Sequence, residues 1–276
     1  MNDGPYAIED LEIDLLLEGI FRRFGLDFRG YRRESLRAKL HVMMARDAIR
    51  TVSGLQEKVM HDAATGDALL RTLCSHPVAL FDDPEHYRAL REVLVPWLRS
   101  SPSPRIWVAE CVAAEEVCSL AILLEEEGLL EKTHVYATSS NEELLRLASE
   151  GSFCAENFSR YDHHYRQSGG KRDLRAYVQA AGDRYVFAKS LCENMTWSQY
   201  NIATDASFNE FELISCRGAL AEFGAALRHR ALQLFHESVP VFGLLSVDGV
   251  LSKGTMPLER CYKPLDNGHG LYRRVA

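Results

Sequence analysis

Apolar residues recur at helical spacing through the first third of the chain. Between residues 6 and 98, leucine, isoleucine, valine and methionine return every three or four positions, with few residues that break helices. This spacing places apolar side chains on one face of each helix. The first such run has Ile8, Leu11, Leu15, Leu16 and Ile20. We therefore predict an all-helical domain over residues 1–98.

The pattern changes after a short linker at residues 99–105, which is rich in serine and proline. Beyond the linker, short β-rich runs alternate with helical patterns. The expected strands are 105–109, 134–138, 212–215, 243–252 and 270–275, and the expected helices are 115–127, 142–150 and 224–238. Such alternation predicts a mostly parallel sheet with helices on both faces, hence a Rossmann-like α/β domain over 106–276. The less regular segment 153–197 is expected to add a β-element or a lid.

Composition and charge exclude several classes of function. The 276 residues are 46% apolar, enough for two domains, and the net charge of −7 gives no reason to expect nucleic acid or an anionic membrane as partner. No apolar run approaches the roughly 18 residues of a membrane span, and the first residues are acidic. We expect a cytoplasmic protein with no membrane insertion and no nucleic-acid partner.

Cysteine and histidine spacing gives no sign of a metal site. The seven cysteines are scattered and contain no C-x-x-C pair, which disfavours both a zinc site and a disulfide framework. His163 and His164 are adjacent, so their side chains diverge, and no residue three or four positions away completes a set of ligands. No metal is therefore expected.

The turn after the first expected strand contains no glycine. Residues 106–121 read IWVAECVAAEEVCSLA. This segment resembles the cofactor motif of the CheR-type chemotaxis receptor methyltransferases, which runs roughly AGCSTGEEPYS. Glu110 and Ala114 stand where that motif has glycine, a residue that lets backbone N–H groups approach a ligand closely. The residues that match the motif are Ala109, Cys111, Glu115, Glu116 and Ser119.

The likeness extends in order over nearly the whole chain. Residues 25–40, 83–90, 211–217, 248–254 and 270–275 each match a family segment. The chain is thus identified as a divergent member of the CheR family. This resemblance implies a helical domain followed by a methyltransferase domain. It also implies transfer of a methyl group from S-adenosylmethionine to glutamate side chains of chemoreceptors.

The departures from the family pattern lie at positions that the family uses for its cofactor. The resemblance implies that Asp82 replaces an arginine near the cofactor carboxylate and that Ser139 replaces an acid that binds the ribose. His76 and Gly218 each stand in place of an asparagine, and Glu222 in place of a tyrosine of the site. We expect no catalytic residue, with Asp82 and Glu222 as degenerate positions. The remnant cofactor positions are Val78, Asp82, Glu110, Ala114, Glu115, Ser139 and Gly218.

The binding free energy lost with these groups argues against cofactor binding in the family's mode. Losing the arginine, the ribose-binding acid and the glycine turn removes about 5–10 kcal/mol, whereas a micromolar ligand has only about 8 kcal/mol in total. The favoured interpretation is a degenerate CheR-like protein without a cofactor. It would act as a regulator or scaffold that binds a signalling protein or a chemoreceptor-like protein.

Two alternatives stay open. The first is an active protein-glutamate O-methyltransferase that binds S-adenosylmethionine and its product S-adenosylhomocysteine. In that enzyme Glu115 or Glu116 would face the cofactor's amino group, although acidic residues also occur commonly in the first turn of a helix. The second is a smaller, more acidic pocket that takes another cationic or apolar molecule.

A locally basic stretch in the helical domain offers a possible docking surface. In the family, such a surface is implicated in binding chemoreceptors. A solvated helix face explains the same residues equally well, because Glu34 and Asp47 interrupt the charge. The candidate docking residues are Arg29, Arg32, Arg33, Arg37 and Lys39.

Overall fold

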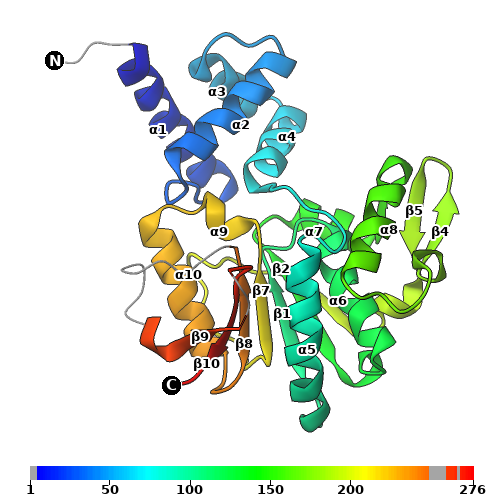
Figure 1. Cartoon of the computed structure of the whole chain (residues 1–276). Coiled ribbons are helices and arrows are strands. Elements are labelled where there is room, and N and C mark those ends of the chain that lie inside the picture. The colour runs from blue at the N-terminus through cyan, green and yellow to red at the C-terminus, as the bar shows by residue number, and fades with distance from the viewer. Residues whose placement is uncertain (1–4, 249–258, 266–267) are drawn as a thin grey trace. The chain divides into compact units, whose positions relative to one another are not determined.

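The computed structural model describes residues 5–248, 259–265 and 268–276 (Figure 1). The chain folds into two compact units. The first comprises Met1–Ser75 with Glu222–Arg228, and the second comprises His76–Ala221 with His229–Ala276.

The first unit is helical, as predicted. Its helices are α1 (Pro5–Phe24), α2 (Arg33–Arg46), α3 (Val52–His61) and α4 (Ala63–Cys74). Their starts follow local chemistry, because the side chains of Thr51 and Asp62 cap α3 and α4 by accepting hydrogen bonds from the free N–H groups of the first turns. The segment 222–228 joins this unit through backbone hydrogen bonds, in which Arg32 donates to Glu222 and Gly224 donates to Gly30, both at 2.8 Å.

The boundary between the units differs from the predicted one. Helix α5 (Pro84–Ser100), which begins after the capping side chain of Asp83, belongs to the second unit rather than to the helical one. Its buried residues Leu90, Leu94 and Leu98 share one core with Ile106 of the central sheet. The first unit therefore ends at Ser75, and not at the linker of residues 99–105.

The second unit is built on a seven-stranded sheet with the order β6-β2-β1-β7-β8-β10-β9. Strands β6, β2, β1, β7 and β8 are parallel, and β10 runs antiparallel to both β8 and β9. This confirms the predicted Rossmann-like architecture. The strands are β1 (Arg105–Ala109), β2 (His134–Ser139), β6 (Met195–Gln199), β7 (Leu213–Cys216), β8 (Leu244–Val247), β9 (Tyr262–Pro264) and β10 (Leu271–Arg274).

Helices cover both faces of this sheet, with α10 on one face and α5 and α6 on the other (Figure 1). The remaining helices are α6 (Ala114–Glu126), α7 (Glu142–Ser149), α8 (Phe158–Gln167), α9 (Ala219–Glu222) and α10 (Ala225–Ser238). Single 3₁₀ turns occur at η1 (Leu130–Lys132), η2 (Ala155–Asn157), η3 (Leu174–Ala176), η4 (Lys189–Cys192) and η5 (Glu259–Cys261).

The irregular segment 153–197 contributes an extra β-element, as predicted. Three short antiparallel strands in the order β3-β5-β4 form a second sheet beside α8 (Figure 1). They are β3 (Ser152–Cys154), β4 (Val178–Ala181) and β5 (Arg184–Phe187). The predicted strand 243–252 is described as far as Asp248, and Leu244–Val247 of it form β8. Residues 249–252, like all but the first residue of the family segment 248–254, lie outside the described residues.

Candidate functional site

A pocket opens beyond the carboxyl ends of β1 and β7. These neighbouring strands lie where the strand order reverses, the position at which open α/β sheets bind ligands. The pocket has a volume of about 80 Å³. Its wall consists of Pro77, Val78, Ala79, Asp82, Tyr87, Glu116, Ser215, Arg217, Gly218 and Asp248.

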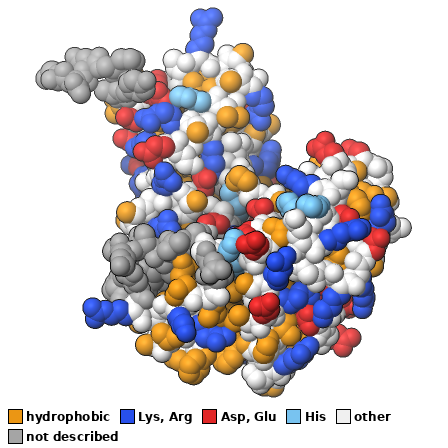
Figure 2. Space-filling view, in the orientation of Figure 1, with side chains coloured by type: hydrophobic (Ala, Val, Ile, Leu, Met, Phe, Trp, Pro, Cys, Tyr) orange, Lys and Arg blue, Asp and Glu red, His pale blue; other side chains and the backbone are white. Residues whose placement is uncertain are grey.

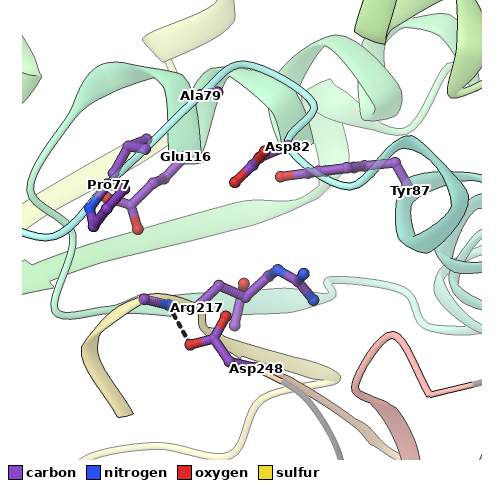
Figure 3. A pocket seen from close by; sticks show the side chains of 10 residues that line it. Pro77, Ala79, Asp82, Tyr87, Glu116, Arg217 and Asp248 are labelled. Carbon is purple, nitrogen blue, oxygen red and sulfur yellow. Dashed lines mark hydrogen bonds between the residues drawn. The ribbon is translucent and has the colours of Figure 1, made fainter. Parts of the chain in front are cut away.

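Charged side chains meet across the pocket from two sides. Asp82 and Glu116 approach from one side, and Arg217 and Asp248 from the other (Figure 3). Asp248 accepts a hydrogen bond from the backbone N–H of Gly218. The Arg217 guanidinium is already engaged, because Nη1 donates to the His269 carbonyl at 2.9 Å and Nη2 to Asp83 Oδ2 at 3.3 Å. The wall is therefore predominantly acidic.

Glu110 follows β1 with a backbone conformation that favours glycine. Its φ is +54°, in the left-handed region that is strained for a residue with a side chain. The carboxylate is buried and Oε2 accepts a hydrogen bond from Ser140 Oγ at 3.1 Å, so it bridges the ends of β1 and β2. Burial raises the pKa of Glu110 to about 7, against the opposing influence of the Ser140 hydrogen bonds and of His76.

The end of β2 is neutral and turned inward. Ser139 is fully buried, and its hydroxyl accepts a hydrogen bond from the backbone N–H of Asn141 at 3.3 Å. Asn141 in turn caps α7 by accepting from the Leu144 N–H at 2.9 Å. Position 139, where the family pattern has a ribose-binding acid, therefore carries a hydroxyl that binds within the turn after β2.

The two adjacent glutamates of α6 have different roles. Glu115 Oε1 accepts a hydrogen bond from the Tyr161 hydroxyl at 3.0 Å, and burial raises the pKa of this carboxyl. Glu116 lines the pocket, and its Oε1 accepts from the N–H groups of Val112 at 2.9 Å and Ala113 at 3.3 Å. The chain's own carboxylate therefore occupies an anion site that a helix N-terminus would otherwise offer to a ligand.

His76 and Gly218 fit each other closely. The His76 side chain is buried, and its Nε2 lies 3.7 Å from Glu116 Oε2, within ion-pair distance but too far for a hydrogen bond. Neither ring nitrogen has a hydrogen-bond partner among the residues that the structure describes. Gly218 has φ +88°, and a Cβ there would lie 2.0 Å from His76 Cδ2. The imidazole therefore fills the space that a side chain at position 218 would need.

The surroundings of His76 favour its charged form. Burial lowers the pKa of the imidazole, but the carboxylates of Glu116, Asp248 and Glu110 outweigh that effect and raise it overall. A protonated His76 offsets part of the acidity beside the pocket.

The structure brings together only some of the residues predicted from the sequence. Val78, Asp82 and Gly218 line the pocket, whereas Ala114 is buried at the start of α6 and Glu115 faces Tyr161. Glu222 is placed in the helical unit, where its carboxylate pairs with Lys39 Nζ at 2.9 Å.

Sequence reasoning undervalued two acids at the pocket. Glu116 occupies the third helical position of α6, where a side chain that reaches back to the preceding N–H groups is a known capping arrangement. Asp248 directly follows β8, and residues just beyond the carboxyl ends of parallel strands often line ligand sites. Both positions are signals that could have identified these residues.

The predicted docking residues are tied into ion pairs within the helical unit. Arg29 pairs with Asp27 and Glu18, Arg33 with Asp14, and Arg32 with Glu34 at 4.0 Å. Arg37 contacts Asp10 and Glu9, and Lys39 contacts Glu222. Basic and acidic side chains accordingly lie side by side on the visible face of this unit (Figure 2).

The described residues contain neither a candidate metal cluster nor a membrane-spanning helix. No group of three or more histidine, cysteine, aspartate or glutamate side chains in the described part of the chain could hold a metal ion. None of the helices described is long and apolar enough to cross a membrane.

The strand order and the pocket at its reversal define a Rossmann-like α/β domain, which an all-helical unit precedes in the chain. The chain belongs to the CheR methyltransferase family. Residues 78–250 match the family's SAM-binding domain, and residues 11–74 match its all-alpha domain.

Relatives of this family align along most of the chain. The putative methyltransferase Cher3 of Pseudomonas putida is 39% identical over 266 residues, which cover 96% of this chain and 97% of the relative. The chemotaxis protein methyltransferase of Listeria innocua is 25% identical over 246 residues, covering 88% of this chain and 91% of the relative. The solved glycopeptide N-methyltransferase MtfA with bound S-adenosylmethionine superposes with a TM-score of 0.35 and 15% identity, covering 70% of this chain and 67% of that one.

Proposed function

We propose that this CheR-family protein has lost S-adenosylmethionine binding and acts as a regulatory or scaffolding protein in bacterial chemosensory-type signalling. The observation that carries the proposal is Glu110. Glu110 stands where the family pattern has a glycine in the turn, with a positive φ. Its carboxylate accepts a hydrogen bond from Ser140 across the ends of β1 and β2. A cofactor that used this turn in the family's manner would have to displace a buried, hydrogen-bonded acid.

Three neighbouring features support the same conclusion. The N–H groups of Val112 and Ala113 already bind Glu116, and the ribose position is held by the inward-turned Ser139. Asp82 lines the pocket where the family has an arginine, so a ligand carboxylate would meet like charge. Each lost charge-assisted hydrogen bond costs about 1.5–3 kcal/mol, a large share of the roughly 8 kcal/mol of micromolar binding.

The proposed partner is a signalling protein or a chemoreceptor-like protein. Relatives named chemotaxis protein methyltransferases support this class of partner, since a family member that loses its reaction can retain a binding surface.

An active protein-glutamate O-methyltransferase is the second candidate. The specific observation in its favour is that Glu116 and Arg217, which match the family pattern, both line the pocket. Methyl transfer depends mainly on holding the acceptor carboxylate in line with the sulfonium methyl group, so it needs few acid–base residues. It does require the cofactor, which makes cofactor binding the decisive measurement.

The experiment is isothermal titration of the purified full chain with S-adenosylhomocysteine, after a check that no cofactor co-purifies. We expect no binding heat at about 1 mM ligand. A Kd of that size corresponds to only about 4 kcal/mol of binding free energy. A combined variant carrying Asp82→Arg, Glu110→Gly, Ala114→Gly and Ser139→Asp should gain measurable affinity.

Glu210→Gly is the matched control, because it removes an exposed loop glutamate outside the pocket wall. It should leave the titration unchanged. A micromolar Kd for the unaltered chain would overturn the proposal, and a methyl-transfer assay on receptor fragments would then test the second candidate.

A further inference from the structure

A further cavity opens at the other end of the central sheet from the pocket described above. Its wall includes Arg105, the first residue of β1, and Glu212, which directly precedes β7. It also includes Val241, in the loop that leads to β8. These three strands are parallel neighbours, so the cavity lies beyond their amino ends. We call it the amino-end cavity, and all of its wall belongs to the second unit.

The amino-end cavity has room for a small organic molecule. Its volume is about 340 Å³, within the roughly 300–1,000 Å³ typical of ligand pockets. One water molecule takes up about 30 Å³ of the liquid, so the cavity corresponds to roughly ten non-hydrogen atoms. A ligand of this size is larger than a single ion and smaller than an adenosyl cofactor.

Two carboxylates on the wall have no cationic partner in the described part of the chain. Glu212 binds neutral donors, since Oε1 accepts a hydrogen bond from Ser101 Oγ at 3.0 Å and Oε2 accepts one from the Arg105 backbone N–H at 2.7 Å. Glu210 is exposed, and its carboxylate forms no hydrogen bond or ion pair with a described residue. Both carboxylates therefore remain available to a positively charged ligand.

Two neighbouring cations bind other groups. The Arg105 guanidinium lines the cavity but donates to the amide oxygen of Asn209. Lys132 lies outside the wall, and its Nζ donates to the backbone carbonyls of Leu98 at 2.8 Å and Ser101 at 2.9 Å. The wall itself thus carries more negative than positive charge, which favours a cationic ligand over an anionic one.

The rest of the wall combines hydroxyl groups with apolar surface. The serines are Ser100, Ser101 and Ser103, and the apolar residues are Trp97, Pro240 and Val241. A primary ammonium group has three N–H donors, for which carboxylates and hydroxyls are suitable acceptors. A quaternary ammonium has no N–H to donate and depends on several surrounding rings, whereas a single aromatic residue lines this cavity.

We propose that the amino-end cavity binds a small primary amine in its protonated form. The ammonium group would donate to Glu210, to Glu212 and to a serine hydroxyl, and the carbon chain would lie against the apolar side of the wall. The site and its ligand are separate from the pocket beyond the carboxyl ends of the strands. The inference therefore goes beyond the proposed function and does not depend on it.

The test is an NMR titration of the ¹⁵N-labelled full chain at pH 7 and about 0.15 M salt. The probes are hexylamine, 1-hexanol and hexanoate, which share a six-carbon chain and differ in charge. The indole N–H signal of Trp97 reports binding, and a Trp97→Phe sample identifies it among the three tryptophans. Hexylamine should bind with a Kd of about 0.1–1 mM, 1-hexanol should bind at least fivefold more weakly, and hexanoate should cause no shift.

Single carboxylate substitutions locate the site. Glu210→Gln should weaken hexylamine at least fivefold and leave 1-hexanol unchanged, because it removes a charge and retains the shape of the side chain. Glu156→Gln is the matched control, since Glu156 is an exposed glutamate of the same unit, outside the cavity wall and without an ion pair among the described residues. It should leave all affinities unchanged, and thermal melts should show both variants folded.

Three results would each overturn the proposal: no shift of the Trp97 signal at about 10 mM hexylamine, equal affinity for hexylamine and 1-hexanol, or equal weakening by Glu210→Gln and Glu156→Gln. Binding of Nα-acetyl-lysine methylamide at least tenfold tighter than hexylamine would also overturn it, because the occupant would then be a lysine side chain of a protein. Titration of Glu210→Gln with S-adenosylhomocysteine keeps a failure here distinct from a failure of the proposed function, because Glu210 lies outside the wall of the first pocket.

Discussion

At the scale of single residues, His76 and Gly218 are packed against each other beside the pocket. His76 is a larger side chain than the asparagine of the family pattern, and Gly218 is smaller than the asparagine it replaces. The His76 ring occupies the space beside the Gly218 Cα, so His76 in this position leaves no room for a side chain at residue 218. Close packing of this kind makes the two positions energetically dependent on each other.

Gly218→Ala should therefore destabilise the protein by about 2–4 kcal/mol, since it combines a clash with His76 and a positive φ. Gly128→Ala is the matched control: Gly128 has φ +64° but nothing within 4 Å of an added Cβ, so it should cost only about 1 kcal/mol. Urea unfolding monitored by circular dichroism measures both changes.

Adding His76→Ala to Gly218→Ala should recover most of the stability that Gly218→Ala loses beyond the loss in Gly128→Ala. The clash disappears in the double variant, and only the strained φ remains. If the double variant is no more stable than the sum of the single changes predicts, the two positions are independent and this account of their exchange is wrong.

Glu110 should make stability depend on pH. Its folded pKa of about 7 lies above its ordinary 4.5, so between these values the folded state binds more protons than the unfolded state. The contribution of this group to the free energy of unfolding therefore falls as pH rises from about 4.5 to about 7. The loss is about 3 kcal/mol on the scale of 1.4 kcal/mol per pKa unit.

Glu110→Gln should remove that loss, since a neutral amide retains the contact with Ser140 without a charge to bury. Urea midpoints at pH 5 and pH 8 should differ less in Glu110→Gln than in the unaltered chain. Glu210→Gln, at an exposed loop position, should behave like the unaltered chain. Identical pH dependence in all three proteins would mean that Glu110 does not titrate in this range.

At the scale of elements, strong local patterns were predictable and weak ones were not. The strand expected at 105–109 is β1, and the helix expected at 115–127 is α6 (Ala114–Glu126), because a buried strand and an amphipathic helix carry clear periodicity. Strands β3, β4 and β5 bury only one residue each and so lack the apolar runs of the central strands. The core that α5 joins depends on contacts distant in sequence, which periodicity cannot report.

The candidate site was likewise only partly predictable from the sequence. The resemblance indicated Val78, Asp82 and Gly218, which do line the pocket. It placed Glu115 among the cofactor positions, whereas Glu116 lines the pocket and Glu115 accepts a hydrogen bond from Tyr161. One residue along a helix turns the side chain by about 100°, so only the packing of α6 decides which glutamate faces the pocket. The contact between Glu110 and Ser140 joins two strand ends and has no signature in the sequence.

The start of α6 should depend on Glu116. Glu116→Ala should lower the free energy of unfolding by about 2 kcal/mol, because two N–H groups lose a charged acceptor. Glu116→Gln should cost less than half as much, since its carbonyl oxygen can still accept. In both variants the pKa of His76, followed by NMR titration, should fall, because Glu116 is the largest influence raising it. Unchanged His76 titration would show that the 3.7 Å separation carries no electrostatic coupling.

At the scale of the whole molecule, the chain builds its helical unit from two distant stretches. Residues 222–228 join residues 1–75, so this unit is completed only after most of the second unit has been made. Lys39 contacts both stretches. Its Nζ donates to the carbonyls of Leu73 at 3.0 Å and Ser75 at 2.7 Å, and it pairs with Glu222 at 2.9 Å. The Lys39 and Glu222 side chains are only 17% and 19% exposed, so water screens this pair less than a surface ion pair.

Lys39→Ala should therefore cost about 2–3 kcal/mol, because the carbonyls of Leu73 and Ser75 lose their donor and Glu222 loses its cation. Glu222→Ala should cost about 1–2 kcal/mol, because it removes the carboxylate that pairs with Lys39 and accepts a hydrogen bond from Ser35. The double variant should be less destabilised than the sum, with a coupling energy of about 1 kcal/mol, since removing one residue already breaks the contact. Arg46→Ala, which removes a solvent-exposed pair with Asp47, should leave the free energy of unfolding nearly unchanged. Urea unfolding of the four variants measures these differences. Strict additivity of the first two would show that residues 222–228 contribute to the helical unit through their backbone alone, and that Lys39 acts only on the end of α4.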